Sequence, residues 1–169
     1  MAFLRIFSIV LSLAGLSGFY YMMVLRHDSP QRTLGKDFKM PDVRLHYTPA
    51  LLYNTYEEAG ETGRPLMRLY WLYDFGLIIC LLGVMIAVSA NIVSSQTWVY
   101  PLMVWLTVAR TLVDILENSL FLYFLRHFPD YHTGVARFAG VVTTGKHLLL
   151  FAWLFLLFMM LFLKAFGIG

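Results

Sequence analysis

Long runs of apolar residues alternate with short polar segments along this chain of 169 residues. Four of the runs reach the roughly 18 residues that a helix needs to cross the hydrocarbon core of a bilayer. The predicted spans cover about residues 4–25, 66–93, 101–125 and 135–166. Because only short segments separate the last three, we expect them to be antiparallel neighbours. The pattern therefore predicts an all-α membrane protein, a single bundle of four transmembrane helices.

The first apolar run also resembles the start of a signal peptide, because Arg5 precedes it. Residues 6–25 are long for the apolar core of such a peptide, and no cleavage site of small residues follows them. We therefore interpret this run as a retained span. It contains no charge within its apolar part, which favours a role as an anchor or docking helix.

The polar stretch 26–65 is the largest extramembrane piece, and it contains the signals of a short helix at about residues 49–59. Thr48 suits the N-cap, Pro49 the first helical position, and Gly60 the left-handed residue that ends a helix. Three apolar side chains share one face of this helix: Leu52, Tyr53 and Tyr56. We expect an interfacial helix on the membrane surface. Packing against the bundle's own loops is the alternative.

The composition supports the membrane assignment. Hydrophobic residues make up 59% of the chain and charged residues 14%, against roughly 45–50% and 25% in ordinary globular domains. Aromatic residues, at 17%, suit the headgroup region, where Trp and Tyr collect. The formal charge of +3 is small and no stretch is strongly basic, so no nucleic-acid partner is expected. One cysteine, Cys80, excludes an internal disulfide.

Lys and Arg are concentrated in two loops, 26–65 and 126–134. Because cytoplasmic loops carry an excess of these residues, both loops are expected on the cytoplasmic or matrix side and both termini on the other. The expected location is a bacterial inner membrane or the inner membrane of an organelle.

Charged side chains interrupt three of the four spans at similar depths. Arg110, Asp114 and Glu117 are spaced by four and three, which places them on one face of the third span. At a rise of about 1.5 Å per residue, the charges of all three spans lie roughly 12–15 Å from the loop surface or deeper. The predicted cluster comprises Asp74, Arg110, Asp114, Glu117, Asn118 and Lys146.

These charges are expected to pair with one another. Each costs about 2.5–3.5 kcal/mol at the centre of a span, so five unpaired charges would oppose insertion by roughly 12–18 kcal/mol. Pairing Lys146 with Glu117 or Asp74, and Arg110 with Asp114, leaves one acid over. The cluster is then either a structural ion-pair network or a functional site: a relay for protons or ions, a pocket for a polar ligand or a catalytic centre.

Four further side chains are candidates for the lining of a pocket: Tyr70, Tyr73, Thr143 and His147. His147 is the only histidine in a span, so a haem held by two histidines is not expected. The cations Arg110 and Lys146 disfavour a metal beside Asp114 and Glu117. Neither a Ser-His-Asp spacing nor a phosphate-binding glycine loop occurs. We therefore predict no catalytic residue, no metal and no cofactor, and we leave a bound lipid open.

The motifs after the first span resemble those of a family of small, uncharacterised four-span membrane proteins. That family has Tyr-Ser/Thr-Pro, Gly-x-x-Gly-Arg, Asp-x-x-Glu-Asn and Thr-x-x-Lys motifs. Here they are residues 47–49, 60–64, 114–118 and 143–146, and the resemblance extends from 47 to about 160. An aromatic residue often follows the lysine, where this chain has His147. The resemblance implies the four-span fold and a set of residues to test, but no activity.

Three functions remain open. The first is a non-enzymatic accessory or structural subunit of a larger membrane complex, with other subunits or copies of itself as partners; the small extramembrane part favours it. The second is a small proton- or ion-coupled transporter that uses Asp74, Glu117 and Lys146. The third is a membrane enzyme that acts on a lipid-like substrate, with Asp114 or Glu117 as acid or base.

Overall fold

The computed structural model describes residues 2–26, 29–35, 37–94 and 96–167, and this part of the chain is entirely helical, without strands. The main helices are α1 (Ala2–Tyr20), α3 (Pro49–Ile92), α4 (Val99–His127) and α5 (Thr133–Ala165). Shorter elements are the π-helix η1 (Tyr21–Leu25), α2 (Pro30–Thr33) and the 3-10 turn η2 (Pro41–Val43).

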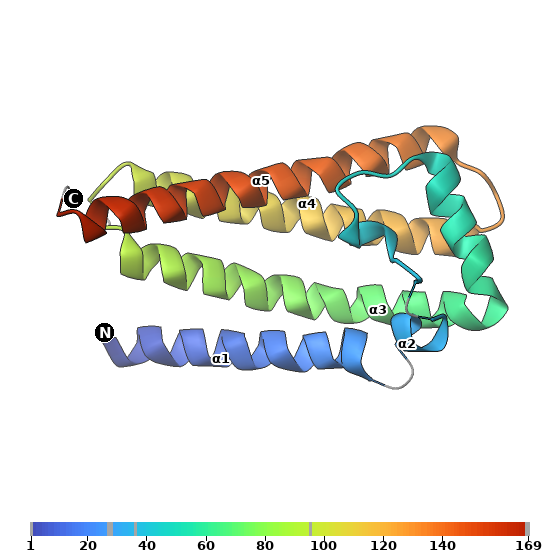
Figure 1. Ribbon diagram of the computed structural model, residues 1–169, viewed down its shortest axis with the longest axis horizontal. Helices are drawn as coiled ribbons and strands as arrows, with labels where there is room; N and C mark the ends of the chain where they lie inside the picture. The colour runs from blue at the N-terminus through green and yellow to red at the C-terminus, as the bar shows by residue number, and fades with distance from the viewer. Residues whose placement is uncertain (1, 27–28, 36, 95, 168–169) are drawn as a thin grey trace.

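Three helices, α3, α4 and α5, are long and apolar enough to cross a membrane. They run side by side in alternating directions, with α1 alongside α3 (Figure 1). Within the described residues there is one shorter apolar helical stretch, Ile9–Leu25 (17 residues), which covers the second half of α1 and all of η1. The prediction of an all-helical, membrane-compatible bundle is confirmed for these three helices.

Gly60 divides α3 into two parts, because its φ of 63° and ψ of −172° are not helical. Before it, the Thr48 hydroxyl accepts a hydrogen bond from the Leu51 amide (3.3 Å), and Pro49 occupies the first turn. This short first part crosses the end of the bundle (Figure 1). Its apolar face packs on the bundle itself, since Tyr53 and Tyr56 are fully buried.

Glycines allow α1 to pack closely against α3. A Cβ added at Gly76 would overlap the Phe19 ring, and one at Gly83 would meet the Ser12 hydroxyl. Small residues at such positions let helices in membranes approach each other. Gly76 and Gly83, about two turns apart on α3, thus mark the close contact between α1 and α3.

The loop between α2 and the short first part of α3 is more than an extramembrane connection. It crosses from the α3 side to the α5 side of the bundle (Figure 1). Five of its side chains are buried: Phe38, Met40, Pro41, Asp42 and Tyr47. At its end, the His46 Nδ1 lies 3.2 Å from the Gly140 carbonyl oxygen, and the Thr144 hydroxyl donates to the Leu45 carbonyl (3.1 Å). These contacts hold the loop against α5.

The bundle interior consists of two hydrophobic clusters with polar residues between them. One cluster lies at the loop end and includes Trp71, Phe121 and Ala139. The other lies towards the termini and includes Met103 and Trp153. Buried charged side chains, together with the polar side chains hydrogen-bonded to their carboxylates, lie between these clusters. We call this set the charged layer; it comprises Asp42, Tyr70, Asp74, Arg110, Asp114, Glu117, Asn118, Thr143 and Lys146.

Candidate functional site: a buried charged layer

Helix α4 supplies the centre of the charged layer. Arg110 and Asp114 are one helical turn apart, and the Arg110 Nη2 lies 2.7 Å from the Asp114 Oδ2. Glu117 lies on the same face and is completely buried. Arg110 and Asp114 are both buried, and their pairing neutralises two charges that would otherwise be costly inside the bundle.

Lys146 joins α5 to α4. Its Nζ contacts the Glu117 carboxylate directly and lies 3.2 Å from the Asp114 Oδ1. The Thr143 hydroxyl, one turn earlier on α5, also donates to Glu117. One ammonium group thus bridges two carboxylates from the facing helix, and the spacing of three between Thr143 and Lys146 brings both donors to the same acid.

Asp74, from α3, has a different partner from the two lysine-bound acids. Its Oδ2 accepts a hydrogen bond from the Asn118 Nδ2 at 2.8 Å. This amide contact links α3 to α4 across the layer. The sequence-based alternative, an ion pair between Asp74 and Lys146, is replaced here by the pair of Lys146 with Glu117.

The loop adds an acid that the sequence did not suggest. The Asp42 Oδ2 accepts a hydrogen bond from the Tyr70 hydroxyl (3.1 Å), and the residue is 8% exposed. Burial raises the pKa of Asp42 to about 6; the Glu117 charge adds to this rise, whereas Lys146 and the Tyr70 hydroxyl oppose it. In the sequence, the apolar residue Met40 in an otherwise polar loop could have indicated that this loop packs on the bundle, and in the structure Met40 is indeed buried.

Two predicted lining residues lie outside the charged layer. Tyr73 is half-buried and packs against the hydrophobic cluster at the loop end. His147 is also half-buried; its Nδ1 lies 2.8 Å from the Thr143 carbonyl oxygen, and its ring contacts Phe151. Tyr70 and Thr143, by contrast, belong to the layer through their bonds to Asp42 and Glu117.

The layer has more acids than bases and more polar atoms than hydrogen bonds. Four carboxyl groups face two cations, a formal charge of −2 if all are ionised: Asp42, Asp74, Asp114, Glu117 against Arg110 and Lys146. Several buried atoms have no hydrogen-bond partner within the described residues: the Asp42 Oδ1, the Arg110 Nε and Nη1, and the Asn118 Oδ1. The two oxygens can each accept a further hydrogen bond, and the two Arg110 N–H groups can donate one, so the layer can hold a small polar species such as water.

The described residues contain no group of three or more His, Cys, Asp or Glu side chains arranged to hold a metal ion. Protein-family models, curated proteins and solved structures were compared with this chain, and none matches it. Its function is therefore inferred from the chemistry of its own residues.

Proposed function

We propose that this chain is an integral membrane protein with four spans and that it serves as a non-enzymatic subunit of a larger membrane complex. The 19 residues of α1 continue directly into the five of η1, and this combined length supports a fourth span. The Lys and Arg content of loops 26–65 and 126–134 favours the cytoplasmic or matrix side for the short first part of α3.

A row of exposed side chains on α5 carries the proposal. Leu148, Phe151, Phe155, Phe158 and Phe162 are spaced by three and four, and each is at least half exposed. We call this row the α5 stripe. Spacing of this kind is typical of a seam along which another helix packs. Trp153, which lies between Phe151 and Phe155 in the sequence, is on the other side of the helix. It is buried, and its ring N–H donates to the Ser89 hydroxyl oxygen of α3 (3.2 Å).

The charged layer supports a structural role for the bundle in such a complex. Lys146 connects α5 to two acids of α4, and Asn118 connects α4 to Asp74 of α3. A buried polar network of this kind has one register in which its members pair, so it favours one arrangement of the helices. A rigid bundle would then present the α5 stripe in a fixed orientation.

Purification in mild detergent, with mass spectrometry of the companions, tests the proposal. We expect a stoichiometric complex, formed with other membrane proteins or with further copies of this chain. Phe155→Leu/Phe158→Leu should remain in the membrane, because leucine is as apolar, but should lose the companion. Trp105→Leu, at an exposed position of α4, is the matched control. Purification of a single monodisperse chain would refute the subunit role. Equal retention of the companion by Phe155→Leu/Phe158→Leu and by Trp105→Leu would refute it as well.

A proton- or ion-coupled transporter is the second candidate, and the excess of carboxyl groups over cations in the layer favours it. The excess of carboxyl groups gives the layer sites for protons, and Asp42 lies on its loop side. Purified protein in liposomes with a pH-sensitive dye inside provides the assay. Transport would be favoured over the subunit role if the parent chain takes up protons and the Asp42→Asn variant folds but does not.

A further inference from the structure

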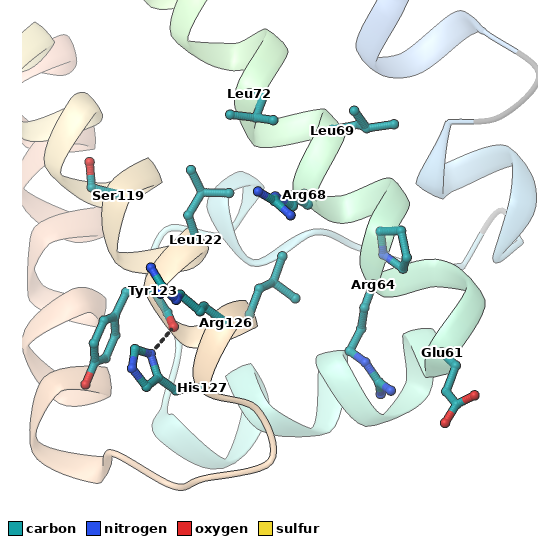
Figure 2. A pocket seen from close by; sticks show the side chains of 12 residues that line it. Glu61, Arg64, Arg68, Leu69, Leu72, Ser119, Leu122, Tyr123, Arg126 and His127 are labelled. Carbon is teal, nitrogen blue, oxygen red and sulfur yellow. Dashed lines mark hydrogen bonds between the residues drawn. The ribbon is translucent and has the colours of Figure 1, made fainter.

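A groove of about 1090 Å³ lies between α3 and α4 at the loop end of the bundle. It is separate from the charged layer, none of whose members lines it. Figure 2 shows arginines from both helices at its walls, next to leucine side chains. Three arginines contribute to the lining: Arg64, Arg68 and Arg126.

The positive charge of this groove is largely uncompensated. Arg68 and Arg126 are exposed and have no hydrogen bond or ion pair within the described part of the chain. Glu61 is the single acid among the described lining residues, so three arginines and one glutamate leave a formal charge of +2 with His127 neutral. The groove is therefore complementary to an anion.

The third arginine is already held in position. The Arg64 guanidinium lies 4.8 Å from the centre of the Phe128 ring, and its Nη1 donates to the Tyr56 carbonyl oxygen at 3.4 Å. Both contacts leave other N–H groups of the guanidinium available. A planar guanidinium fixed in this way matches the geometry of a phosphate group.

Apolar side chains continue the groove towards the middle of the bundle. Leu69 and Leu72 of α3 are 43% and 46% exposed, and Leu122 of α4 lies opposite. Leu72 follows Arg68 by one helical turn, a rise of about 6 Å. The groove thus changes within one turn from cationic to apolar in the direction that leads into the bilayer. A soluble anion would use only its outer half.

The geometry points to a binding site for an anionic phospholipid. Its phosphate lies among Arg64, Arg68 and Arg126, and one acyl chain follows the leucines between α3 and α4. Basic pockets between transmembrane helices, at the side where loops are rich in Lys and Arg, bind lipid head groups of this class. The inference requires α3 and α4 to be in the membrane, but it is independent of the subunit or transporter role.

Native mass spectrometry of the full chain, with added phosphatidylglycerol, tests the site. We expect one tightly bound phosphatidylglycerol per chain and no comparable binding of phosphatidylcholine. Arg68→Gln/Arg126→Gln should weaken the binding about 30-fold, because each basic residue contributes about a factor of five near a membrane surface. Arg32→Gln/Arg137→Gln is the control: it removes the same charge at exposed positions outside the groove and should bind like the parent chain.

Competition distinguishes a lipid from a free phosphate. Inorganic phosphate and glycerophosphoglycerol, which has the head group without acyl chains, should not displace the lipid at equal concentration. Displacement by either one would overturn the lipid assignment. The site would be overturned if Arg68→Gln/Arg126→Gln and Arg32→Gln/Arg137→Gln weakened phosphatidylglycerol binding equally, or if phosphatidylcholine bound as tightly as phosphatidylglycerol. Circular dichroism and size-exclusion profiles equal to those of the parent chain show that a variant is folded.

Discussion

Replacing Lys146 by methionine is the sharpest test of the charged layer. The change keeps the length and apolar stem of the side chain but removes the ammonium group from between the Asp114 and Glu117 carboxylates. Asp114 keeps Arg110 at 2.7 Å, whereas Glu117 keeps only the Thr143 hydroxyl. One fully buried carboxylate is then left without a cation.

The structure sets the size of the effect. Removing one partner of a buried ion pair costs about 3–5 kcal/mol, because the other charge stays buried and uncompensated. The double change Lys146→Met/Glu117→Met removes both charges, and the Thr143 hydroxyl retains its bond to the Ala139 carbonyl (3.1 Å). Replacing both partners by apolar side chains of similar size should cost less than about 1.5 kcal/mol.

Equilibrium unfolding in mild detergent, with an increasing mole fraction of dodecyl sulfate and tryptophan fluorescence as the signal, measures both free energies. Lys164→Met, an identical change at an exposed position of the same helix, should stay within about 0.5 kcal/mol of the parent. A single variant that loses less than about 1 kcal/mol, or a double variant as unstable as the single one, would refute the ion-pair network. If the double variant folds but the cell loses the function, the charges themselves carry the activity.

Three further outcomes are expected. Because burial raises the pKa of Asp42 from 3.8 to about 6, the folded state should lose about 3 kcal/mol of stability as the pH rises from about 3 to about 7; Asp42→Asn should lack this loss, and a variant with the same pH profile as the parent chain would refute the role of Asp42. Gly76→Leu should separate α1 from α3, because the new side chain overlaps the Phe19 ring; protease sensitivity or a lost crosslink between the two helices measures this. Trp153→Phe should cost about 1 kcal/mol through its bond to Ser89, and Ser89→Ala should add little to it in a double-mutant cycle.

The sequence predicted those parts of the layer that depend on helical spacing. Arg110 and Asp114 are four residues apart on one helix, so their pairing follows from the geometry of α4 alone. Depth along the spans also brought Lys146 to the height of Glu117. Depth did not decide between Glu117 and Asp74 as its partner, because that choice depends on the rotation of each helix about its own axis.

The loop could not be predicted in the same way. Asp42 reaches the layer because the backbone after it lies against α5, where a Cβ on Gly140 would be 2.6 Å from the Tyr47 carbonyl oxygen. That close approach is a tertiary contact between residues almost a hundred positions apart, and no periodicity marks it. The polar composition of residues 26–65 indicated only that the segment was not a span.

The bridge from Lys146 to Glu117 also has a consequence for synthesis of the chain. Glu117 is made 29 residues before its cation, which is about 1.5–6 s at ribosomal rates of 5–20 residues per second. Throughout that interval α4 carries one acid more than Arg110 can balance, at a cost of about 3 kcal/mol in hydrocarbon. We therefore expect α4 to remain beside the insertion machinery until α5 emerges, so that the two helices enter the bilayer as a pair.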